Sequence, residues 1–454
     1  MQRRMRRDSL IDYAARSVPR YTSYPTAAQF TGAVGAREAE SWMRELGPSD
    51  RVSLYVHLPF CARMCWYCAC HALVANDYRR VQAYLERLHS EIEAVAGKLP
   101  QHGGIAGLHF GGGTPTLLAP ADFERLAETL RSRFGVGDEA EIAVEVDPRS
   151  FDAEMAGALS RAGVSRVSLG VQDFEPEVQQ AIGRVQPYEM VARTIDLLHA
   201  HGIHRIGFDL LYGLPGQSEA GIAGTAERAA GLWPDRLAVY GYAHLPEIKR
   251  HQQMIDAERL PDAAGRLTLA EAVEDTLSAE GYRPVGFDHY AWPSDTLAVA
   301  ADRGYLHRNF QGYTDDPSDA VIGLGVSAIS SFASGYAQNS PDLKAYRAAI
   351  DAGRLATARG IVLSREDRLR RAVIERLMCD FRVDLPAQST AYGFEPDALD
   401  DAFPALDPLM RDGLITLSQR QIAVTELGRR FVRHVAHCFD TAGSARPARY
   451  SRAV

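Results

Sequence analysis

Between residues 52 and 243, short runs of β-branched and aromatic residues alternate with longer amphipathic segments. The short runs predict six strands, which end near Leu58, Phe110, Val146, Val171, Leu211 and Ala243. The longer segments have the periodicity of amphipathic helices and cover residues 77–98, 121–134, 152–161, 188–201 and 219–231. This alternation predicts an α/β fold built from a parallel βα series.

The segments on either side of this series have other patterns. Residues 1–50 predict a short basic helix and then SVPRYTSYPTAAQF, which is either an arm laid over the fold or a loose surface extension. Residues 361–440 predict a helical domain that ends in a hairpin and a helix, a winged-helix-like pattern without a basic recognition helix. We therefore predict three parts: an arm at 1–50, a barrel with an extension at 51–360, and a C-terminal domain at 361–454 with a mobile or flap-like tail.

The extension contains a predicted helix at 263–280, a strand near 283–287 and then a stretch rich in aromatic and polar residues. The spacing of its histidines does not match a metal site. We expect this stretch to line a pocket, and its candidate residues are His289, His307, Arg308, Asn309, Gln311 and Tyr313.

Composition narrows the class of protein. The 454 residues are 46% hydrophobic and 24% charged, which is typical of a soluble globular chain of two or three domains. No run of about 18 apolar residues occurs, and the basic start lacks an apolar signal region, so we expect a cytoplasmic enzyme without a membrane segment. The formal net charge of −8 argues against general nucleic-acid binding but permits an anionic substrate in a local pocket.

Four of the six cysteines occur together, which favours a reducing compartment over a disulfide framework. Cys61, Cys65 and Cys68 have the spacing Cys-x3-Cys-x2-Cys, and Cys70 follows. Such clustered thiols indicate zinc, a redox disulfide or an iron–sulfur cluster. A structural zinc site normally has a second pair of ligands, and a thioredoxin-like pair would leave Cys61 unexplained. Three cysteines on one loop can bind three irons of a 4Fe-4S cluster and leave the fourth iron open.

Polar or glycine-rich residues follow the predicted strands, where a βα barrel places its active site. Gly111–Thr116 (GGGTPT) follows the second strand and permits close backbone approach. Glu145 is expected in the site, whereas Asp147 before a proline is also a good helix N-cap. Arg184 either reaches inward or is solvated. The other candidates at strand ends are Gln172, Asp173 and Asp209.

The cysteine spacing resembles that of the radical S-adenosylmethionine superfamily. The motifs YVHLPFC, HFGGGTPT, EVDPR, VSLGVQDF, DLLYGLPGQ, NFQGYT and VSAIS, with PRYTSYPT before them, resemble the oxygen-independent coproporphyrinogen III oxidases over nearly the whole chain. This resemblance implies an incomplete (β/α)6 TIM-like barrel of the radical SAM type. It also implies an N-terminal arm near the site and a small, mostly helical, winged-helix-like C-terminal domain.

The resemblance further implies the reaction, in which the ring A and ring B propionates of coproporphyrinogen III become the vinyl groups of protoporphyrinogen IX. The implied cofactors are a 4Fe-4S cluster and two molecules of S-adenosylmethionine. The implied partners are an electron donor of the flavodoxin or ferredoxin type and an unnamed electron acceptor. We expect a monomer that binds no nucleic acid and no membrane.

By match to the family's motifs, the implied cluster ligands are Cys61, Cys65 and Cys68. Cys70 matches a fourth cysteine that is not a ligand but is needed for activity. The residues that match contacts of the first S-adenosylmethionine are Tyr55, Gly112, Glu145 and Ile329. Those that match contacts of the second are Tyr67, Gly113, Thr114, Gln172, Arg184, Asp209 and Ala243.

The chain departs from its relatives beside the fourth cysteine, where His71-Ala72 replaces Asn-Lys and Ala69 replaces a more usual Gly. These changes affect the expected geometry of the second cofactor site. A competing hypothesis is a haem-binding chaperone of the same superfamily, but such chains lack the counterparts of Cys70 and of the PRYTSYPT arm. A radical enzyme that acts on another tetrapyrrole is the third hypothesis.

Overall fold

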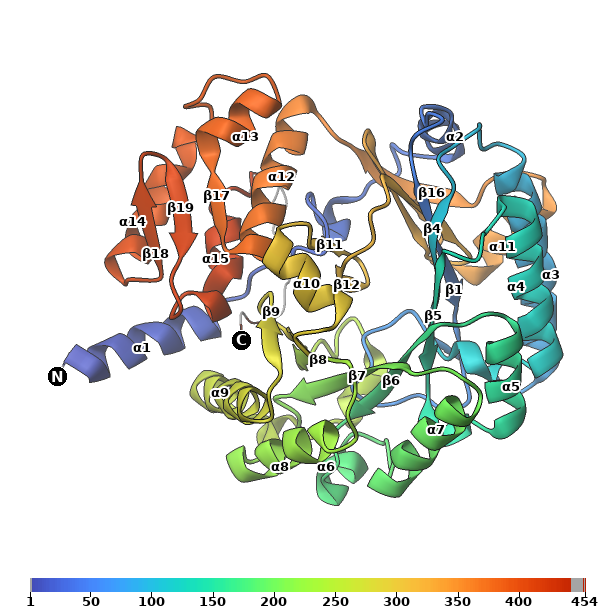
Figure 1. Cartoon of the computed structure of the whole chain (residues 1–454), viewed down its shortest axis with the longest axis horizontal. Helices are drawn as coiled ribbons and strands as arrows, with labels where there is room; N and C mark the ends of the chain where they lie inside the picture. The colour runs from blue at the N-terminus through green and yellow to red at the C-terminus, as the bar shows by residue number, and fades with distance from the viewer. Residues whose placement is uncertain (1, 442–451, 453) are drawn as a thin grey trace.

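The computed structural model describes residues 2–441, 452 and 454. All six predicted strands are present, and they are adjacent and parallel within one large sheet (Figure 1). They are β1 (Val52–Leu58), β4 (Ile105–Gly112), β5 (Glu141–Val146), β6 (Arg166–Gln172), β7 (Arg205–Tyr212) and β8 (Arg236–Gly241). The predicted βα series is therefore confirmed.

The helices between these strands are also confirmed, with ends that differ from the prediction by a residue or two. They are α3 (Tyr78–Ala96), α4 (Pro120–Phe134), α5 (Ala153–Arg161), α7 (Tyr188–Ala200) and α8 (Glu219–Ala230). A short helix, α6 (Pro176–Ala181), was not predicted. Figure 1 shows these helices along the outside of the curved sheet, so the strand ends and their loops remain accessible at its edge.

The sheet continues beyond the six predicted strands at both ends. Beyond β1 lie β13 (Ala320–Leu324), which is parallel to it, and then the antiparallel strands β14 (Ile329–Phe332), β15 (Gly335–Asn339) and β16 (Thr357–Val362). Beyond β8 lie the antiparallel strands β10 (His289–Ala291) and β9 (Arg283–Val285). The strand order runs from β16 to β9 without closing, so the barrel is incomplete.

The alternation of side chains along β1 explains how the sheet separates core from site. Leu54 and Val56 are almost fully buried and belong to the main hydrophobic cluster, together with Leu85 and Leu88 of α3. Because successive strand residues face opposite sides of a sheet, Tyr55 lies on the other side from Leu54 and Val56. The apolar positions of β1 therefore hold the helices, and its polar positions face the barrel interior.

The remaining elements flank the barrel. The helices are α1 (Gln2–Ala15), α2 (Ala36–Arg44), α9 (Ala263–Ala279), α10 (Thr296–Arg303), α11 (Leu343–Asp351), α12 (Arg365–Asp380), α13 (Leu385–Ala391), α14 (Phe403–Arg411) and α15 (Val432–His437). Two short pairs are β2 (Phe60–Cys61) with β3 (Leu73–Val74) and β11 (His307–Asn309) with β12 (Gly312–Thr314). Across the described part of the chain, no helix combines the length and apolar character needed to cross a membrane.

The C-terminal region has its own small sheet and hydrophobic cluster. The sheet contains β17 (Arg382–Asp384), β19 (Gln421–Val424) and β18 (Ile415–Ser418), and the last two form the predicted hairpin before α15. Tyr13 of α1 packs on Phe431 and His434, so the start of the chain lies against its end. Most of the predicted mobile tail (443–454) lies outside the described residues.

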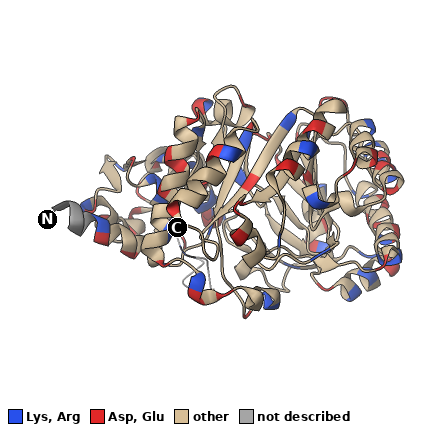
Figure 2. Ribbon diagram, turned by 90° about the horizontal axis from the view of Figure 1, so that it is seen from below, with Lys and Arg blue, Asp and Glu red and all other residues tan. Residues whose placement is uncertain are grey.

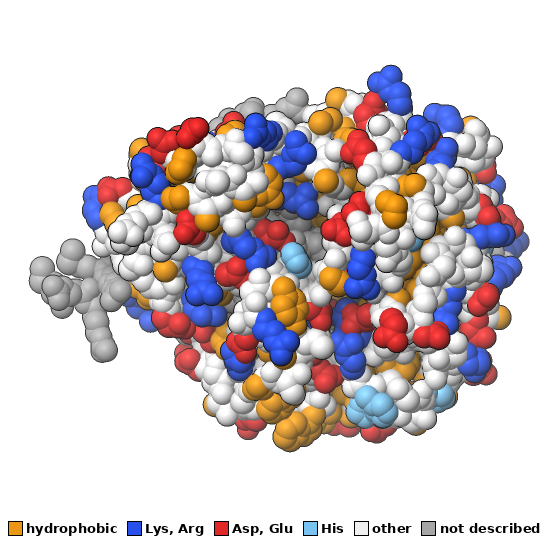
Figure 3. Space-filling model, turned by 45° about the horizontal axis from the view of Figure 1, so that its top comes forward, with side chains coloured by type: hydrophobic (Ala, Val, Ile, Leu, Met, Phe, Trp, Pro, Cys, Tyr) orange, Lys and Arg blue, Asp and Glu red, His pale blue; other side chains and the backbone are white. Residues whose placement is uncertain are grey.

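Charged side chains of both signs are interspersed over the surface (Figures 2 and 3). Some of them form pairs one helical turn apart, such as Arg44 with Glu40 in α2 and Arg411 with Asp407 in α14. Pairs at this spacing stabilise exposed helices by only about 0.2–0.5 kcal/mol each. The fold therefore depends on its buried clusters, and the surface charge chiefly maintains solubility.

Within the predicted arm (1–50), the irregular stretch 17–30 crosses from the C-terminal region to the sheet edge. The buried Tyr21 donates a hydrogen bond to Asp440 Oδ2 (3.0 Å), and Arg433 Nε donates to the carbonyl of Pro19 (2.8 Å). At the other end, Thr31 and Gly360 exchange backbone hydrogen bonds (2.8 and 2.9 Å). The arm is therefore laid over the fold, and it is not a loose extension.

Replacing the buried Arg433 tests how the arm is held. Arg433 donates to the carbonyls of both Val18 and Pro19, and hydrogen bonds from a charged donor contribute about 1.5–3 kcal/mol each. We expect Arg433→Met to speed amide hydrogen exchange in residues 18–25 by about tenfold to a hundredfold. Arg411→Met is the matched control, because Arg411 is exposed and its ion pair in the described structure is with Asp407 on its own helix. Equal exchange in the two variants would contradict this assignment.

Candidate active site

The loop that carries the four clustered cysteines leaves β1 at the edge where the parallel strands end. Two adjoining cavities, of about 620 and 740 Å³, lie at this edge. All fifteen site residues implied by the resemblance line one cavity or the other. The larger cavity includes Tyr55 and Ile329, and the smaller includes Cys61, Cys65, Tyr67, Cys68, Gly113, Thr114, Gln172, Arg184 and Ala243. Both cavities include Cys70, Gly112, Glu145 and Asp209.

Hydrogen bonds from other elements hold the backbone of the cysteine loop. The Trp66 N–H donates to the carbonyl of Ile182 (3.0 Å), beside α6. Three side chains of the segment after β8 donate to loop carbonyls: Lys249 to Cys70 (2.8 Å), His251 to Cys68 (2.7 Å) and Gln252 to Tyr67 (3.0 Å). His251 Nε2 must carry the proton here, because a carbonyl oxygen only accepts. The loop is thus fixed by contacts that no local sequence pattern specifies.

The glycine run after β4 is required by close contact with the cysteine loop. The N–H of Gly113 donates to the carbonyl of Leu58, and the N–H of Thr114 donates to that of Phe60, both at 2.8 Å. A Cβ atom on Gly113 would lie 2.7 Å from Phe60 O, and Gly112 has a φ of 113° with a Cβ position 2.5 Å from the His57 ring. Only glycine permits this approach, so the predicted role of GGGTPT as a close-approach turn is confirmed.

The three thiols differ in their surroundings. Burial raises the pKa of Cys61 to about 11, although the Thr114 hydroxyl donates to its sulfur at 3.4 Å. A hydrogen bond from the Cys70 thiol lowers the pKa of Cys68 to about 6, and the same bond raises the pKa of Cys70. The side chain of Cys70 is exposed, and it lines the smaller cavity. It is therefore a thiol that supports the charge of Cys68 from the cavity side.

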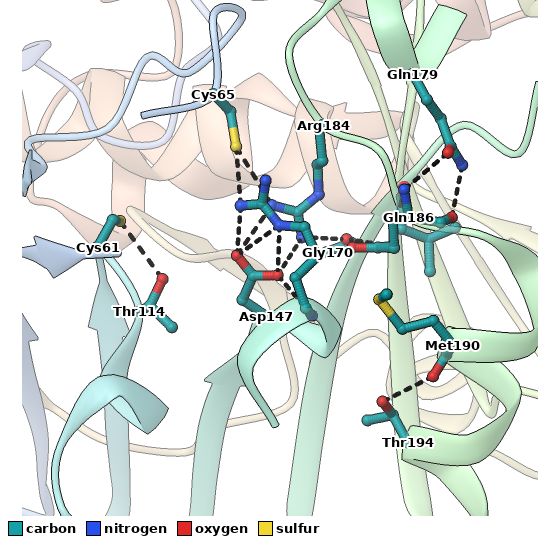
Figure 4. Close-up of polar contacts among 12 residues, drawn as sticks. Cys61, Cys65, Thr114, Asp147, Gly170, Gln179, Arg184, Gln186, Met190 and Thr194 are labelled. Carbon is teal, nitrogen blue, oxygen red and sulfur yellow. Dashed lines mark hydrogen bonds and ion pairs between the residues drawn. The ribbon is translucent and has the colours of Figure 1, made fainter. Parts of the chain in front are cut away.

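Two guanidinium groups lie next to the sulfur of Cys65 (Figure 4). Arg149 Nη2 lies 3.2 Å and Arg184 Nη1 lies 3.4 Å from Cys65 Sγ. Both arginines also pair with Asp147, which caps the short 3-10 helix η3 (Pro148–Ser150) through the Arg149 N–H. Asp147 is thus both the predicted N-cap and a site residue, and Arg184 reaches inward. Two arginines and one aspartate leave a net positive charge beside Cys65.

Glu145 lies under the glycine run on the interior side of β5. It accepts hydrogen bonds from the Gly112 N–H (3.0 Å) and from His109 Nε2 (3.4 Å). Burial alone would raise its pKa, but the hydrogen bonds from His109 and Gly112 outweigh that effect and lower it. Glu145 is therefore ionised and faces both cavities, as is suitable for a ligand group that carries positive charge.

The side chain of Tyr55 points to His57 on the same strand. His57 Nε2 donates to the carbonyl of His71 (2.9 Å), and burial lowers the pKa of His57 to about 4, so its ring is neutral. Nδ1 is then the acceptor, and the Tyr55 hydroxyl donates to it at 3.0 Å. This chain of hydrogen bonds orients Tyr55 and joins β1 to the residue that follows Cys70.

Asp209 is the second carboxylate of the shared wall. Its burial and the nearby charge of Glu145 raise its pKa to about 7, although the Ser168 hydroxyl donates to it at 3.3 Å. Two carboxylates in one cavity thus have separate protonation states near neutral pH, because each ionised group disfavours ionisation of the other. Glu145 is charged, and Asp209 is close to its midpoint.

Sequence reasoning placed two residues wrongly and missed several others. Asp173 lines neither cavity: it is buried and accepts hydrogen bonds from Gln217 Nε2 (2.6 Å) and the Thr225 hydroxyl (3.0 Å). His307 does not line either cavity but bonds to Glu375 of α12 (3.0 Å), whereas the other five residues proposed as pocket lining surround the larger cavity. Arg20 and Thr22 of the arm line both cavities, and Arg149 lines the smaller one. Arg149 is part of the motif EVDPR, so the sequence offered a signal for it. Whether its side chain points into the cavity, however, depends on the turn after β5.

These residues fit an iron–sulfur cluster better than a single metal ion. Over the described residues, no group of three or more His, Cys, Asp or Glu side chains converges on one ion. Cysteines of a 4Fe-4S cluster bind different irons, so they surround a larger volume, as the three thiols around the smaller cavity do. Arg184 Nε is also buried there with no hydrogen-bond partner in the described structure, which suits an anionic group of a ligand.

Comparison with known proteins identifies the family. The family model described as the Radical SAM superfamily matches residues 55–229, and the HemN C-terminal domain matches residues 363–431. A protein of Bradyrhizobium diazoefficiens named oxygen-independent coproporphyrinogen III oxidase is 44% identical over 450 residues, which cover 99% of this chain and all of that protein. One of the same name from Pseudomonas aeruginosa is 41% identical and covers 96% of both chains.

A solved structure agrees with these matches. Coproporphyrinogen III oxidase from Escherichia coli, described as a radical SAM enzyme, aligns with a TM-score of 0.89 and 39% identity over 93% of this chain and 97% of that chain. A relative with this identity and coverage shares both the family and the fold. The chain therefore belongs to the family of oxygen-independent coproporphyrinogen III oxidases, within the radical SAM superfamily.

Proposed function

We propose that this chain converts coproporphyrinogen III to protoporphyrinogen IX without oxygen, in porphyrin and haem biosynthesis. Two propionate groups each lose carbon dioxide, a hydrogen atom and one electron, and become vinyl groups. The observation that carries the proposal is the single cavity that Cys61, Cys65 and Cys68 line with the strand-end residues. It occurs in a chain that is 44% identical, over essentially its whole length, to a protein named for this reaction.

We also propose that Cys61, Cys65 and Cys68 hold a 4Fe-4S cluster and that two S-adenosylmethionine molecules occupy the adjoining cavities. When bound, these cofactors supply a 5′-deoxyadenosyl radical, which is strong enough to remove a hydrogen atom from an unactivated propionate carbon. The chain binds and orients its ligands. Glu145 offers an ionised carboxylate to a cationic ligand, and Arg184 offers a guanidinium to an anionic one.

The arm limits access of water to these cavities. Arg20 donates to the carbonyl of Gly241 (2.5 Å) at the end of β8, and Arg20 and Thr22 lie at the wall that the two cavities share. A closed cavity protects a radical from side reactions with solvent. We further propose a cytoplasmic monomer. A flavodoxin-type or ferredoxin-type donor would supply the electron for radical formation, and a separate acceptor would take the electron that remains on the substrate when carbon dioxide is lost.

An anaerobic assay tests the proposed reaction directly. Reconstituted protein is incubated with coproporphyrinogen III, S-adenosylmethionine and a reductant, and protoporphyrinogen IX and 5′-deoxyadenosine are quantified. We expect both products, with at least one deoxyadenosine per vinyl group formed. Deoxyadenosine without a tetrapyrrole product would move the substrate to another compound. Neither product, combined with tight haem binding, would favour a haem chaperone.

Replacing one proposed ligand tests the cluster site. We expect Cys61→Ser to lose most of the visible iron–sulfur absorbance after anaerobic reconstitution, because a serine hydroxyl is a poor substitute for a thiolate on iron. The matched control is Cys438→Ser, because Cys438 is a half-buried thiol of the C-terminal region whose sulfur donates to the His434 carbonyl. An unchanged spectrum in Cys61→Ser would refute the ligand assignment.

The raised pKa of Asp209 predicts pH-dependent binding of S-adenosylmethionine. Below its pKa of about 7 Asp209 is neutral, and above it the carboxylate attracts the positive sulfonium or ammonium group. We therefore expect affinity to rise from pH 6 to pH 8, by up to about tenfold per pH unit below the pKa. The groups that act on Asp209 are Glu145, Ser168, Arg184 and Arg166.

Calorimetry on cluster-loaded protein measures this effect. Asp209→Asn should bind S-adenosylmethionine more weakly at pH 8 and lack the part of the pH dependence that belongs to Asp209. Titration of the ligand itself is common to both proteins, so their difference isolates the side chain. An identical pH profile in wild type and variant would contradict the prediction.

A further inference from the structure

The sulfur atoms of the three clustered cysteines receive different hydrogen-bond donors. Cys61 Sγ accepts from a neutral hydroxyl, that of Thr114. Cys65 Sγ instead accepts from two charged donors, Arg149 Nη2 at 3.2 Å and Arg184 Nη1 at 3.4 Å (Figure 4). Cys65 is also the most buried of the three, with 7% of its surface exposed. Two charged donors therefore act at this one sulfur, whereas Cys61 accepts from a neutral one.

Arg149 is held in this position by Asp147. Its Nε donates to Asp147 Oδ1 (2.9 Å) and its Nη2 to Asp147 Oδ2 (2.6 Å), while its own backbone N–H bonds to the same carboxylate (3.1 Å). A bidentate arginine–carboxylate pair fixes the plane of the guanidinium. The Nη2 group that reaches Cys65 is therefore already ordered by the fold.

The two arginines differ in their other contacts. Arg184 Nη2 donates to the carbonyl of Gly170 (2.6 Å), and Arg184 Nε is buried without a partner in the described structure, so this residue also serves the ligand cavity. Within the part of the chain that the structure describes, Arg149 donates hydrogen bonds to Asp147 and Cys65 alone. Asp147 neutralises only one of the two guanidinium groups, so a positive charge remains beside Cys65.

A charged donor at a ligand sulfur changes the energy of the electron that the cluster accepts. Hydrogen bonds to ligand sulfur and nearby positive charge stabilise the more negative, reduced form, so they raise the reduction potential. The effect is large at a buried sulfur, because the low local dielectric strengthens the interaction. Arg149 meets each of these conditions.

We propose that Arg149 raises the reduction potential of the cluster by donating to the sulfur of Cys65. It acts through Cys65 and not on a substrate, so Arg149 is a positioning residue. The inference rests on the proposed ligation of the cluster by Cys61, Cys65 and Cys68. It concerns a residue outside the cofactor contacts that the resemblance implies, and it explains why Asp147 pairs with two arginines.

A potentiometric titration of the reconstituted protein, followed by electron paramagnetic resonance without S-adenosylmethionine, tests the proposal. In Arg149→Met we expect the equilibrium between reduced and oxidised cluster to shift at least tenfold toward the oxidised form, which is about 59 mV for one electron. The control is Arg205→Met. Arg205 pairs with Glu141 where β7 and β5 begin, which is the end of the strands away from the cysteine loop, so this variant should leave the potential unchanged.

A second variant keeps the test decisive if Arg149→Met does not retain the cluster. Arg149→Lys preserves the positive charge but cannot bond to Asp147 and Cys65 through a rigid fork, so its potential should fall between those of wild type and Arg149→Met. A wild-type potential in every variant that loads iron and sulfide would overturn the proposal. The substrate assignment is separate: a lowered potential in a protein that does not oxidise coproporphyrinogen III would support the role of Arg149 and refute the proposed reaction.

Discussion

The site depends on a backbone contact between two loops, in which the N–H groups of Gly113 and Thr114 donate to the carbonyls of Leu58 and Phe60. This contact joins the end of β4 to the start of the cysteine loop. It brings the Thr114 hydroxyl to the sulfur of Cys61 and places Gly112 where its N–H reaches Glu145. Any side chain on Gly113 would overlap the backbone of Phe60. A local steric constraint thus sets the relative positions of a thiol, a hydroxyl and a carboxylate.

The electrostatics of the cavities follow from the same arrangement. Positive charge gathers around Cys65, where Arg149 and Arg184 share Asp147, while negative charge lies at Glu145 and Asp209 on the shared wall. Such separation suits a cofactor that carries both a carboxylate and a cationic sulfonium. It also keeps the pKa values of the two carboxylates apart, because one remains ionised and the other is near its midpoint at neutral pH. Binding and protonation are therefore linked in this site.

The two ends of the chain contribute to a site that the barrel alone leaves open. Arg433, near the C-terminus, holds the carbonyls of Val18 and Pro19, and the adjacent Arg20 then reaches the end of β8. The described residues of the C-terminal region line neither cavity, so this region influences the cavities through the arm. The hydrophobic cluster around α12 and α15 therefore matters for the site, because the stability of this cluster determines how firmly the arm covers the cavities.

The sequence by itself determined the features that depend on local periodicity and spacing: six strands, their helices, the cysteine triad and the glycine turn. It did not predict β13 to β16, because β13, β14 and β15 follow one another without the amphipathic helices that mark a βα series. It also could not predict the partners of side chains far apart in the chain. Arg149 and Arg184 are 84 and 119 residues from Cys65, yet they meet at its sulfur. Only the tertiary structure decided this, because strand order and twist, which no local pattern specifies, place the ends of β5 and β6 beside the cysteine loop.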